Sequence, residues 1–517
     1  MHVVEAEIRE PLILGEKSYN DITEDVCAPI EGKANAMWYF VFGLAGLVAL
    51  WGIGNILYTI GVGIGVWGLN KTVGWAWDIT NFVWWVGIGH AGTLISAVLL
   101  LFRQRWRMAI NRSAEAMTIF AVMMAALFPG IHMGRIWQAY WVLPLPNQFG
   151  SLWPNFNSPL LWDVFAISTY FSVSLVFWYI GLIPDFATVR DRMIKPLPKK
   201  IYSILAFGWS GNAKHWNRFE EVSLVLAGLA TPLVFSVHSI VSMDFATSVI
   251  PGWHTTIFPP YFVAGAVFSG FAMVLTLMLV MRKVFRLEDY LTLKHIEYMN
   301  IIIMLTGSMV GVAYLTELFV AWYSGVEYEG YAFMNRATGP YWWAYWSMMT
   351  CNVISPQLMW FKKIRRNLVV TFILSIIVNI GMWFERFVII VTSLHRDFLA
   401  SSWTQFHPTY VDMGVFLGTI GLFFVLFLLY ARVFPVLALN EVKTILRATG
   451  EYGVKKHIHQ ISHSNGQSNH AVVEEEVEVE KEPVLEVEQN GVDTPVEEMK
   501  DVSVSEEEDI EDKKEQD

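Results

Sequence analysis

The chain has 517 residues, of which 54% are hydrophobic, 15% aromatic and only 16% charged. So low a share of charge over this length excludes a soluble globular protein and indicates a polytopic membrane protein. The charge is unevenly placed: residues 471–517 hold 20 acids and 4 bases (net −16), so the total of −11 leaves about +5 on residues 1–470.

The first 36 residues are charged and lack the apolar stretch of a cleavable signal peptide, so we expect a cytoplasmic N-terminal segment, 1–36. Two cysteines, Cys27 and Cys351, stand far apart and form no CxxCH, CxxC or ferredoxin spacing. We therefore expect neither covalent haem nor an iron–sulfur cluster held by the usual thiolates.

Apolar runs long enough to cross a bilayer as helices occur ten times along the chain. They cover 37–60, 78–102, 114–134, 160–183, 221–247, 259–281, 296–322, 341–361, 368–393 and 411–434. Tryptophan and tyrosine cluster at the ends of these runs, as is typical of the membrane interface. The sequence thus predicts an all-α integral membrane domain over 37–435.

The connecting loops alternate in charge. The loops 103–112, 190–200, 281–286 and 362–366 are basic, and the loops between them carry little positive charge. Because basic loops stay in the cytoplasm, both termini are expected there. Residues 436–517 are expected to be a cytoplasmic and largely disordered acidic tail. Its histidine run (457–463) could bind a metal, although a solvated tail suits its polar composition better.

Spans 2–5 and spans 6–9 resemble each other. The segments 91–107 and 264–286 both begin with small residues, continue as a long apolar run and end in a basic turn. We predict two four-helix bundles with spans 1 and 10 outside them, because membrane proteins often contain such repeats. The two copies differ in their polar residues, since His132 of the first corresponds to Glu317 of the second.

Three ionisable residues, His132, Asp163 and Asp244, are predicted at one depth, near the non-cytoplasmic ends of the first bundle. An aspartate at the start of a helix can simply cap it. Together, three such groups in apolar surroundings suit a ligand site. Arg135 is expected one turn beyond His132 on the same helix face, where it could tune the charge or hold a carboxylate. The aromatic residues expected nearby are Trp137, Trp153 and Trp162.

A flat ring with two redox-active oxygens would fit this set of residues. Oxidation of a hydroquinone releases two protons and needs a hydrogen-bonded base at each hydroxyl group. A histidine and a carboxylate can serve as these bases. An electron acceptor must lie close by, and the chain offers no metal ligands of its own for that task.

A second polar set is predicted deeper in the spans. It consists of His90, His238, Glu317, Glu385 and Arg386. Glu385 and Arg386 could be an intramembrane ion pair, or the whole set could belong to a proton path through both bundles. Ligation of b-type haem by two of His90, His132 and His238 is less favoured, because axial histidines lie at matched depth and His90 lies deeper than His132.

Four segments carry a resemblance to a known family. They are "GIGHAGTLISAVLLLFRQRWR" (87–107), "LFPGIHMGRIW" (127–137), "LLWDVFAISTYF" (160–171) and "TPLVFSVHSIVSMDF" (231–245). They strongly resemble the NrfD/polysulfide reductase membrane-subunit family and, more narrowly, the C subunit of alternative complex III, a bacterial menaquinol-oxidising respiratory complex. The resemblance covers about 37–435 and leaves out the acidic tail.

The resemblance implies a multi-pass subunit of the bacterial inner membrane that oxidises menaquinol near the periplasmic face. It implies no haem or metal in this chain, and an iron–sulfur partner above the quinol pocket that receives the electrons. Further implied partners are c-type haem subunits, a paralogous NrfD-like membrane subunit and a terminal cytochrome oxidase, with lipid around them and no nucleic acid. The family's quinol-site histidine and two aspartates match His132, Asp163 and Asp244.

Other functions remain open at this point. The chain could be the quinone-interacting membrane anchor of a molybdopterin oxidoreductase of the polysulfide reductase kind, since the same fold serves both. An ion or solute transporter would also use a repeat and a deep polar set, but many such transporters have inverted repeats and this one is parallel. In a purely structural anchor the polar residues would serve only helix contacts, and single substitutions would have mild effects.

Overall fold

The computed structural model describes residues 11–15, 17–142 and 159–446, all of which belong to one compact unit of the chain. Nine helices of these residues are long and apolar enough to cross a membrane. They are α2 (Ala36–Val62), α3 (Trp77–Leu101), α4 (Asn111–His132), α5 (Pro159–Arg192), α7 (Ala213–Ala246), α8 (Phe258–Val284), α9 (Leu293–Tyr323), α14 (Leu368–Leu394) and α15 (Tyr410–Val433). The predicted all-α membrane fold is confirmed, and each of these helices covers one predicted span.

The predicted span 341–361 is a helical segment of mixed geometry. It runs through α11 (Trp342–Met349), the π turn η4 (Thr350–Ile354), α12 (Ser355–Gln357) and the 3₁₀ turn η5 (Leu358–Trp360). Pro356 gives the physical reason, because a proline ring collides with the carbonyl group four residues earlier in a regular α-helix. That carbonyl belongs to Asn352, inside the π turn, where the wider helix relieves the collision.

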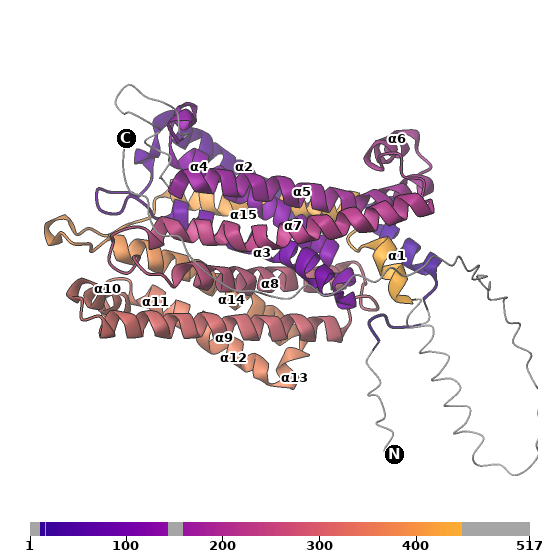
Figure 1. The fold of residues 1–517 in the computed structure, drawn as a ribbon. Coiled ribbons are helices and arrows are strands. Elements are labelled where there is room, and N and C mark those ends of the chain that lie inside the picture. The colour runs from indigo at the N-terminus through magenta and orange to yellow at the C-terminus, as the bar shows by residue number, and fades with distance from the viewer. Residues whose placement is uncertain (1–10, 16, 143–158, 447–517) are drawn as a thin grey trace, which may run out of the picture. The chain divides into compact units, whose positions relative to one another are not determined.

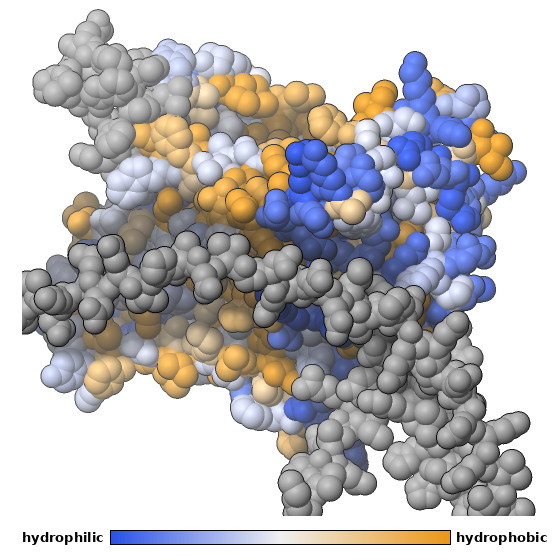
Figure 2. All heavy atoms as spheres, turned by 45° about the vertical axis from the view of Figure 1, so that its right-hand side comes forward, coloured by the Kyte–Doolittle hydropathy of each residue, from blue (hydrophilic) through white to orange (hydrophobic). Residues whose placement is uncertain are grey.

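Shorter helices lie at the two ends of the long ones. They are α1 (Tyr19–Glu31), η1 (Ile64–Val66), η2 (Arg105–Ala109), η3 (Ile136–Val142), α6 (Pro196–Leu205), α10 (Glu327–Thr338), α13 (Lys362–Arg365) and η6 (Ala400–Ser402). Figure 1 shows α1 and α6 at one end of the long helices and α10 at the other. The end with α1 and α6 carries the basic loops and is called the basic end here; hydrophilic residues gather over it in Figure 2.

The long helices pack as two bundles joined along one seam. α3, α4, α5 and α7 pack against one another, and α8, α9, α14 and the segment 342–360 form the second group. α3 and α7 contact α8, which joins the two groups, while α2 lies along α15 outside both. The arrangement agrees with the predicted bundles of spans 2–5 and 6–9, flanked by spans 1 and 10.

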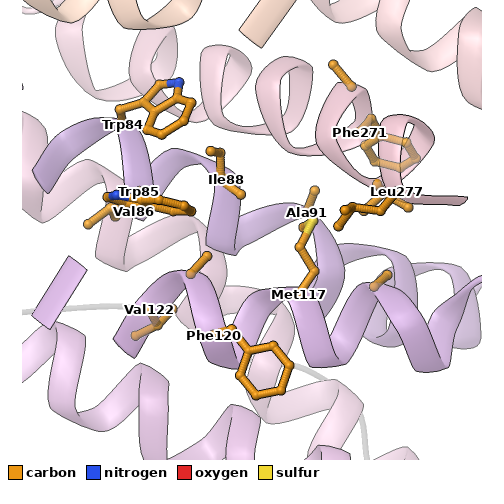
Figure 3. Packing of buried hydrophobic residues seen from close by; sticks show 14 of the residues in the cluster. Trp84, Trp85, Val86, Ile88, Ala91, Met117, Phe120, Val122, Phe271 and Leu277 are labelled. Atoms are coloured by element: carbon orange, nitrogen blue, oxygen red, sulfur yellow. The ribbon is translucent and has the colours of Figure 1, made fainter. Parts of the chain in front are cut away.

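The central helices approach closely through small residues. Figure 3 shows side chains of α3 between α4 and α8, with Ala91 and Met117 facing each other across the α3–α4 contact. A Cβ atom on Gly270 of α8 would lie 2.3 Å from the Cβ of Ala91, so only glycine fits there. Gly52 of α2 and Gly418 of α15 meet in the same way, which is the close backbone packing common between membrane helices.

Residues 436–446 pack against the basic end of the first bundle, although they fall in the region expected to be a tail. Ser113 donates a 2.7 Å hydrogen bond to the carbonyl of Val436, and Asn440 donates one of 2.9 Å to Asp185. Glu441 forms a 2.9 Å ion pair with Arg107. The acidic stretch and histidine run after residue 446 lie outside the described residues.

Candidate functional site

The candidate site lies at the end opposite the basic end, where all four helices of the first bundle begin or finish. α3 and α5 begin there, and α4 and α7 finish there. Each contributes one ionisable side chain: Asp78 from α3, His132 from α4, Asp163 from α5 and Asp244 from α7. The alternating direction of the spans, which was used to predict this grouping, thus places all four groups at one end.

Asp163 and Asp244 form a buried pair of carboxyl groups. Their residues are 3% and 9% exposed, and the two side chains interact directly with each other. Neither oxygen of Asp163 has a hydrogen-bond donor among the described residues, and neither aspartate forms an ion pair with a described base. Asp163 therefore does not cap α5. Two buried acids held together without a base cost free energy when both are ionised. The two negative charges repel each other, and burial deprives each of them of hydration.

His132 is paired with an acid that the sequence analysis missed. Its Nδ1 interacts with Oδ2 of Asp78, in the first turn of α3. The other oxygen, Oδ1, accepts a 3.0 Å hydrogen bond from the backbone of Ala76, which fixes the carboxylate. Asp78 lies in "WAWDIT", whose tryptophans pointed to an ordinary membrane interface. The same depth argument that selected Asp163 would have selected Asp78.

Aromatic rings connect the two pairs. The ring centre of Trp75 lies 6.5 Å from that of His132 and 6.1 Å from that of Phe245, the neighbour of Asp244. Trp67 and Trp253 complete this group: Trp67 lies 6.5 Å from His132, and Trp253 stacks on Trp75 at 5.7 Å. No hydrogen bond between the described residues joins the Asp78–His132 pair to the Asp163–Asp244 pair.

The tryptophans predicted to surround the site are not the ones found there. Trp137 is 60% exposed and Trp162 is 37% exposed, so neither provides a buried wall. Trp153 lies outside the described residues, in the segment 143–158 between α4 and α5. Trp67 and Trp75 were missed because they belong to a loop whose path to the site leaves no periodic pattern in the sequence.

Arg135 does not lie on the helix face of His132. α4 ends at His132, and Gly134 has a φ of 66°, which turns the chain out of the helix. The i, i+3 relation that was expected to place Arg135 beside His132 is therefore wrong. Arg135 is exposed, and its side chain forms no ion pair with a described residue.

Two of the deeper residues, His90 and His238, are in direct contact in the first bundle. Their ring centres lie 4.5 Å apart, and His90 also stacks on Tyr170 at 5.0 Å. His90 Nδ1 bonds the carbonyl of Val86, whereas neither ring nitrogen of His238 has a partner among the described residues. A haem does not fit between these two rings, because edge contact leaves no room for a macrocycle.

The other deep residues lie in the second bundle, close to bases. Arg386 forms an ion pair with Glu385, which also accepts a 2.5 Å hydrogen bond from Tyr314. Asn352 donates to the same carboxylate and to the Tyr314 hydroxyl. Glu317 and Arg336 interact electrostatically and line a cavity of about 20 Å³, enough for one water molecule.

Phe262 connects the deep residues of the two bundles. The guanidinium of Arg386 lies over its ring at 4.4 Å, and the ring centre of His238 lies 5.9 Å away. Four of the five deep residues, all except Glu317, are thus linked side by side across the α7–α8 seam. Glu317 is linked to them through Tyr314 and Tyr261, which line the same small cavity; the ring centre of Tyr261 lies 5.5 Å from that of Phe262.

Comparison with known proteins agrees with this architecture. The family model described as polysulphide reductase, NrfD, matches residues 65–396. A protein of Halobacterium salinarum, provisionally named as the membrane C subunit of dimethyl sulfoxide reductase, is 26% identical over 234 residues, which are 45% of this chain and 49% of that protein. The C subunit of the selenate reductase of Mesobacillus selenatarsenatis is 20% identical over 436 residues, 81% of this chain and 98% of that protein. The chain thus spans about half the length of the first relative and nearly all of the second.

Proposed function

This chain belongs to the polysulphide reductase NrfD family, and we propose that it is the quinol-oxidising membrane subunit of a respiratory oxidoreductase complex. The observation that carries the proposal is the buried Asp163–Asp244 pair without a base, next to the Asp78–His132 pair. Placing an ionisable side chain inside a membrane costs free energy, so such residues usually occur where a reaction or transport requires them. No structural partner among the described residues accounts for the two acids.

The proposed reaction converts a quinol into a quinone, two protons and two electrons. One hydroxyl group of the quinol would give its proton to the Asp163–Asp244 pair, where the added proton relieves repulsion between two like charges. The other hydroxyl group would give its proton to His132, which Asp78 holds in place and stabilises as a cation. Both electrons would leave to an iron–sulfur partner, so the subunit would not be active alone. Menaquinol is the quinol that the sequence resemblance suggests.

The similar proteins favour a reductase as the complex. Both named relatives are C subunits of reductases, one for dimethyl sulfoxide and one for selenate. By this analogy the chain is the membrane anchor of a molybdopterin enzyme, and electrons pass from quinol through an iron–sulfur subunit to a molybdenum subunit. Because one fold serves many functions, the substrate of such an enzyme is identified at its molybdenum subunit and not at its anchor.

Alternative complex III is the second candidate, favoured by the four sequence segments that resemble its C subunit. In that case the partners would include c-type haem subunits, a paralogous NrfD-like subunit and a terminal cytochrome oxidase. Purification of the complex from its native membrane distinguishes the two: a molybdenum cofactor identifies the reductase, and covalent haem identifies alternative complex III.

The proposed orientation places the basic end in the cytoplasm of a bacterium and the candidate site near the periplasmic face of the inner membrane. Both termini would then be cytoplasmic. Cysteine accessibility tests this orientation: a cysteine in place of exposed Lys200 on α6 should react with a membrane-impermeant maleimide only after the membrane is opened. Labelling of intact cells would reverse the orientation.

The central test of the proposal is quinol oxidation by the purified complex carrying Asp163→Asn or Asp244→Asn. We expect each variant to lose at least about a hundredfold in rate, the usual contribution of a positioned acid or base. Asp397→Asn, a half-exposed acid in a loop at the same end, is the matched control and should keep full activity. Near-normal turnover of Asp163→Asn in a fully assembled complex would make the cluster a structural network.

Proton translocation coupled to this reaction is a further part of the proposal, supported by the contacts that join His90 and His238 to Glu385 and Arg386 across the two bundles. We expect His90→Phe to lower the number of protons moved per electron in proteoliposomes while quinol oxidation continues. An unchanged stoichiometry in both His90→Phe and Glu385→Gln would refute a path through these residues.

A further inference from the structure

A long apolar groove runs along the outside of the helices, between the α2–α15 pair and the second bundle. Its volume is about 640 Å³, and its walls come from α2, α3, α8, α14 and α15. At the basic end of the molecule the groove is lined by Trp38, Val284, Phe285 and Ala431. The opposite part of the groove, deeper in the spans, is lined by Trp84, Trp383 and Phe416. The groove thus extends from the membrane surface at the basic end into the hydrocarbon region.

The lining of the groove suits hydrocarbon and not redox chemistry. Two polar side chains in the wall below the mouth bond within the protein: the Thr276 hydroxyl bonds Ala272 and Ser375, and the Asn379 amide nitrogen donates to Ser375. The amide oxygen of Asn379 has no partner among the described residues. Ionisable side chains are absent from the described wall of the groove. Below its mouth the groove therefore recognises an occupant mainly by its apolar chains.

Basic residues surround the mouth of the groove at the basic end. Lys283 follows Val280 by three residues and so lies beside it on α8, and Arg286 follows the lining residue Phe285. Both side chains are exposed and pair with no described acid. Arg432 follows Ala431 and donates a 2.6 Å bond to the carbonyl of Gly32, which brings exposed Lys33 to the same region. Glu288, an acid two residues beyond Arg286, forms no ion pair with a described base.

Trp38 adds a donor at the same place. It is the third residue of α2, stacks on Phe42 at 4.8 Å and lines the mouth of the groove. Its indole nitrogen is buried and has no acceptor among the described residues. Tryptophan at a membrane interface normally directs this N–H toward polar groups of the lipid. A glycerol ester carbonyl is an acceptor of that kind.

We propose that the groove binds one anionic glycerophospholipid of the leaflet at the basic end. Its acyl chains lie between the α2–α15 pair and the second bundle, its ester groups meet the Trp38 N–H, and its phosphate meets Lys283 and Arg286. Clusters of Lys and Arg at the ends of membrane helices recognise anionic headgroups in this way. The lipid would fill the space between two groups of helices that otherwise touch little along this line.

The charge at the mouth of the groove favours lipid over a helix of a partner protein. A helix would leave Lys283 and Arg286 without an anion unless it carried acids at that depth. The charge at the mouth and the narrow apolar space together fit a charged headgroup with two chains.

Native mass spectrometry of the purified full-length protein in its complex tests the proposal, with phosphatidylglycerol or phosphatidylcholine as the added lipid. We expect one phosphatidylglycerol to stay bound and phosphatidylcholine to be lost. Each of the two bases is expected to form one charged contact with the headgroup. Removing both, in Lys283→Gln/Arg286→Gln, should therefore weaken phosphatidylglycerol binding roughly 30-fold. Trp38→Phe, which removes the N–H and reduces the indole to a single ring, should weaken it about threefold to tenfold. Lys199→Gln/Lys200→Gln on α6 is the matched control and should bind as the unaltered protein does.

Four results would overturn the proposal. Equal retention of both lipids would show that the mouth does not select an anion. Unchanged binding in Lys283→Gln/Arg286→Gln, with quinol oxidation as a check that the complex is folded, would place the headgroup elsewhere. Stoichiometric crosslinking of a second polypeptide to a cysteine introduced at Val280 would show that a partner helix occupies the groove. Displacement of the bound lipid by excess inorganic phosphate would show a free-phosphate site.

Discussion

The two four-helix bundles differ in how they hold the buried acids that lie away from the basic end. In the first bundle Asp163 and Asp244 lie against each other with no described base in contact. Nearer the basic end of the same bundle, Glu115 and Asp185 pair with Arg112. In the second bundle Glu385 is paired with Arg386, and Glu317 interacts with Arg336. A buried acid with a base can be explained by structure alone, whereas two buried acids without one need another reason. The difference, more than the presence of acids, distinguishes the proposed reaction site from its counterpart.

The largest stability effect is expected from breaking the ion pair of the second bundle. Arg386→Met leaves Glu385 buried without its base, and losing one partner of a buried pair typically costs about 3–5 kcal/mol. Thermal unfolding of the purified complex measures this loss. By contrast, Asp163→Asn should leave the unfolding temperature unchanged or raise it, because it removes a repulsion.

A double variant controls for the Arg386 result. Glu385→Leu/Arg386→Met removes both charges and should regain most of the stability that Arg386→Met loses, since apolar replacements of buried pairs are often close to neutral. If Asp163→Asn proved as destabilising as Arg386→Met, the two bundles would not differ in the way described.

An intermediate effect is expected from Asp78→Asn. The asparagine still accepts a hydrogen bond but no longer stabilises a charged His132, so we expect quinol oxidation to slow roughly tenfold, or about 1.4 kcal/mol in activation free energy. A role in positioning predicts that kcat falls while KM changes little, and that Asp78→Ala is slower still. Equal rates for the unaltered protein and Asp78→Ala would remove Asp78 from the site.

The smallest effect is expected from Glu317→Gln. Arg336 keeps hydrogen bonds of 3.0 Å to the Gly252 carbonyl and the Ser393 hydroxyl, so it does not depend on Glu317 alone. We expect a change in unfolding free energy within about 1 kcal/mol, near the usual size of polar contacts between membrane helices. A loss as large as that of Arg386→Met would show that Glu317 is the required counter-ion of Arg336.

Hydropathy was enough to predict most of the fold. The apolar runs place the ends of α3, α8 and α14 within a few residues, because a bilayer imposes a minimum length on every span. It could not predict the break in 341–361, where a single proline and a π turn change the helix without changing its mean hydropathy. Nor could it predict α1, α6 and α10, which are too short or too polar to cross a membrane.

The candidate site was predictable where it depended on depth and unpredictable where it depended on chain turns. Alternating spans bring Asp163 and Asp244 to one end, and the structure holds them together. The prediction for Arg135 was wrong because α4 ends at His132 and Gly134, with its positive φ, turns the chain away before Arg135. Asp78 was passed over because its tryptophan neighbours suggested an interface, although its depth was the same as that of the other acids.

The π turn at Thr350–Ile354 makes the second bundle sensitive to length. A π turn holds one more residue than a regular α-helix would, and one residue corresponds to a rotation of about 100° around the helix axis. The turn places Asn352 beside Tyr314 and Glu385. Removing a single residue there would restore a regular α-helix and leave the parts on either side in their present register, because the π turn takes up one extra residue. Only the side chains inside the turn would be reoriented. A deletion that leaves hydropathy and every charge unchanged would then separate the Asn352 amide from the carboxylate that it contacts.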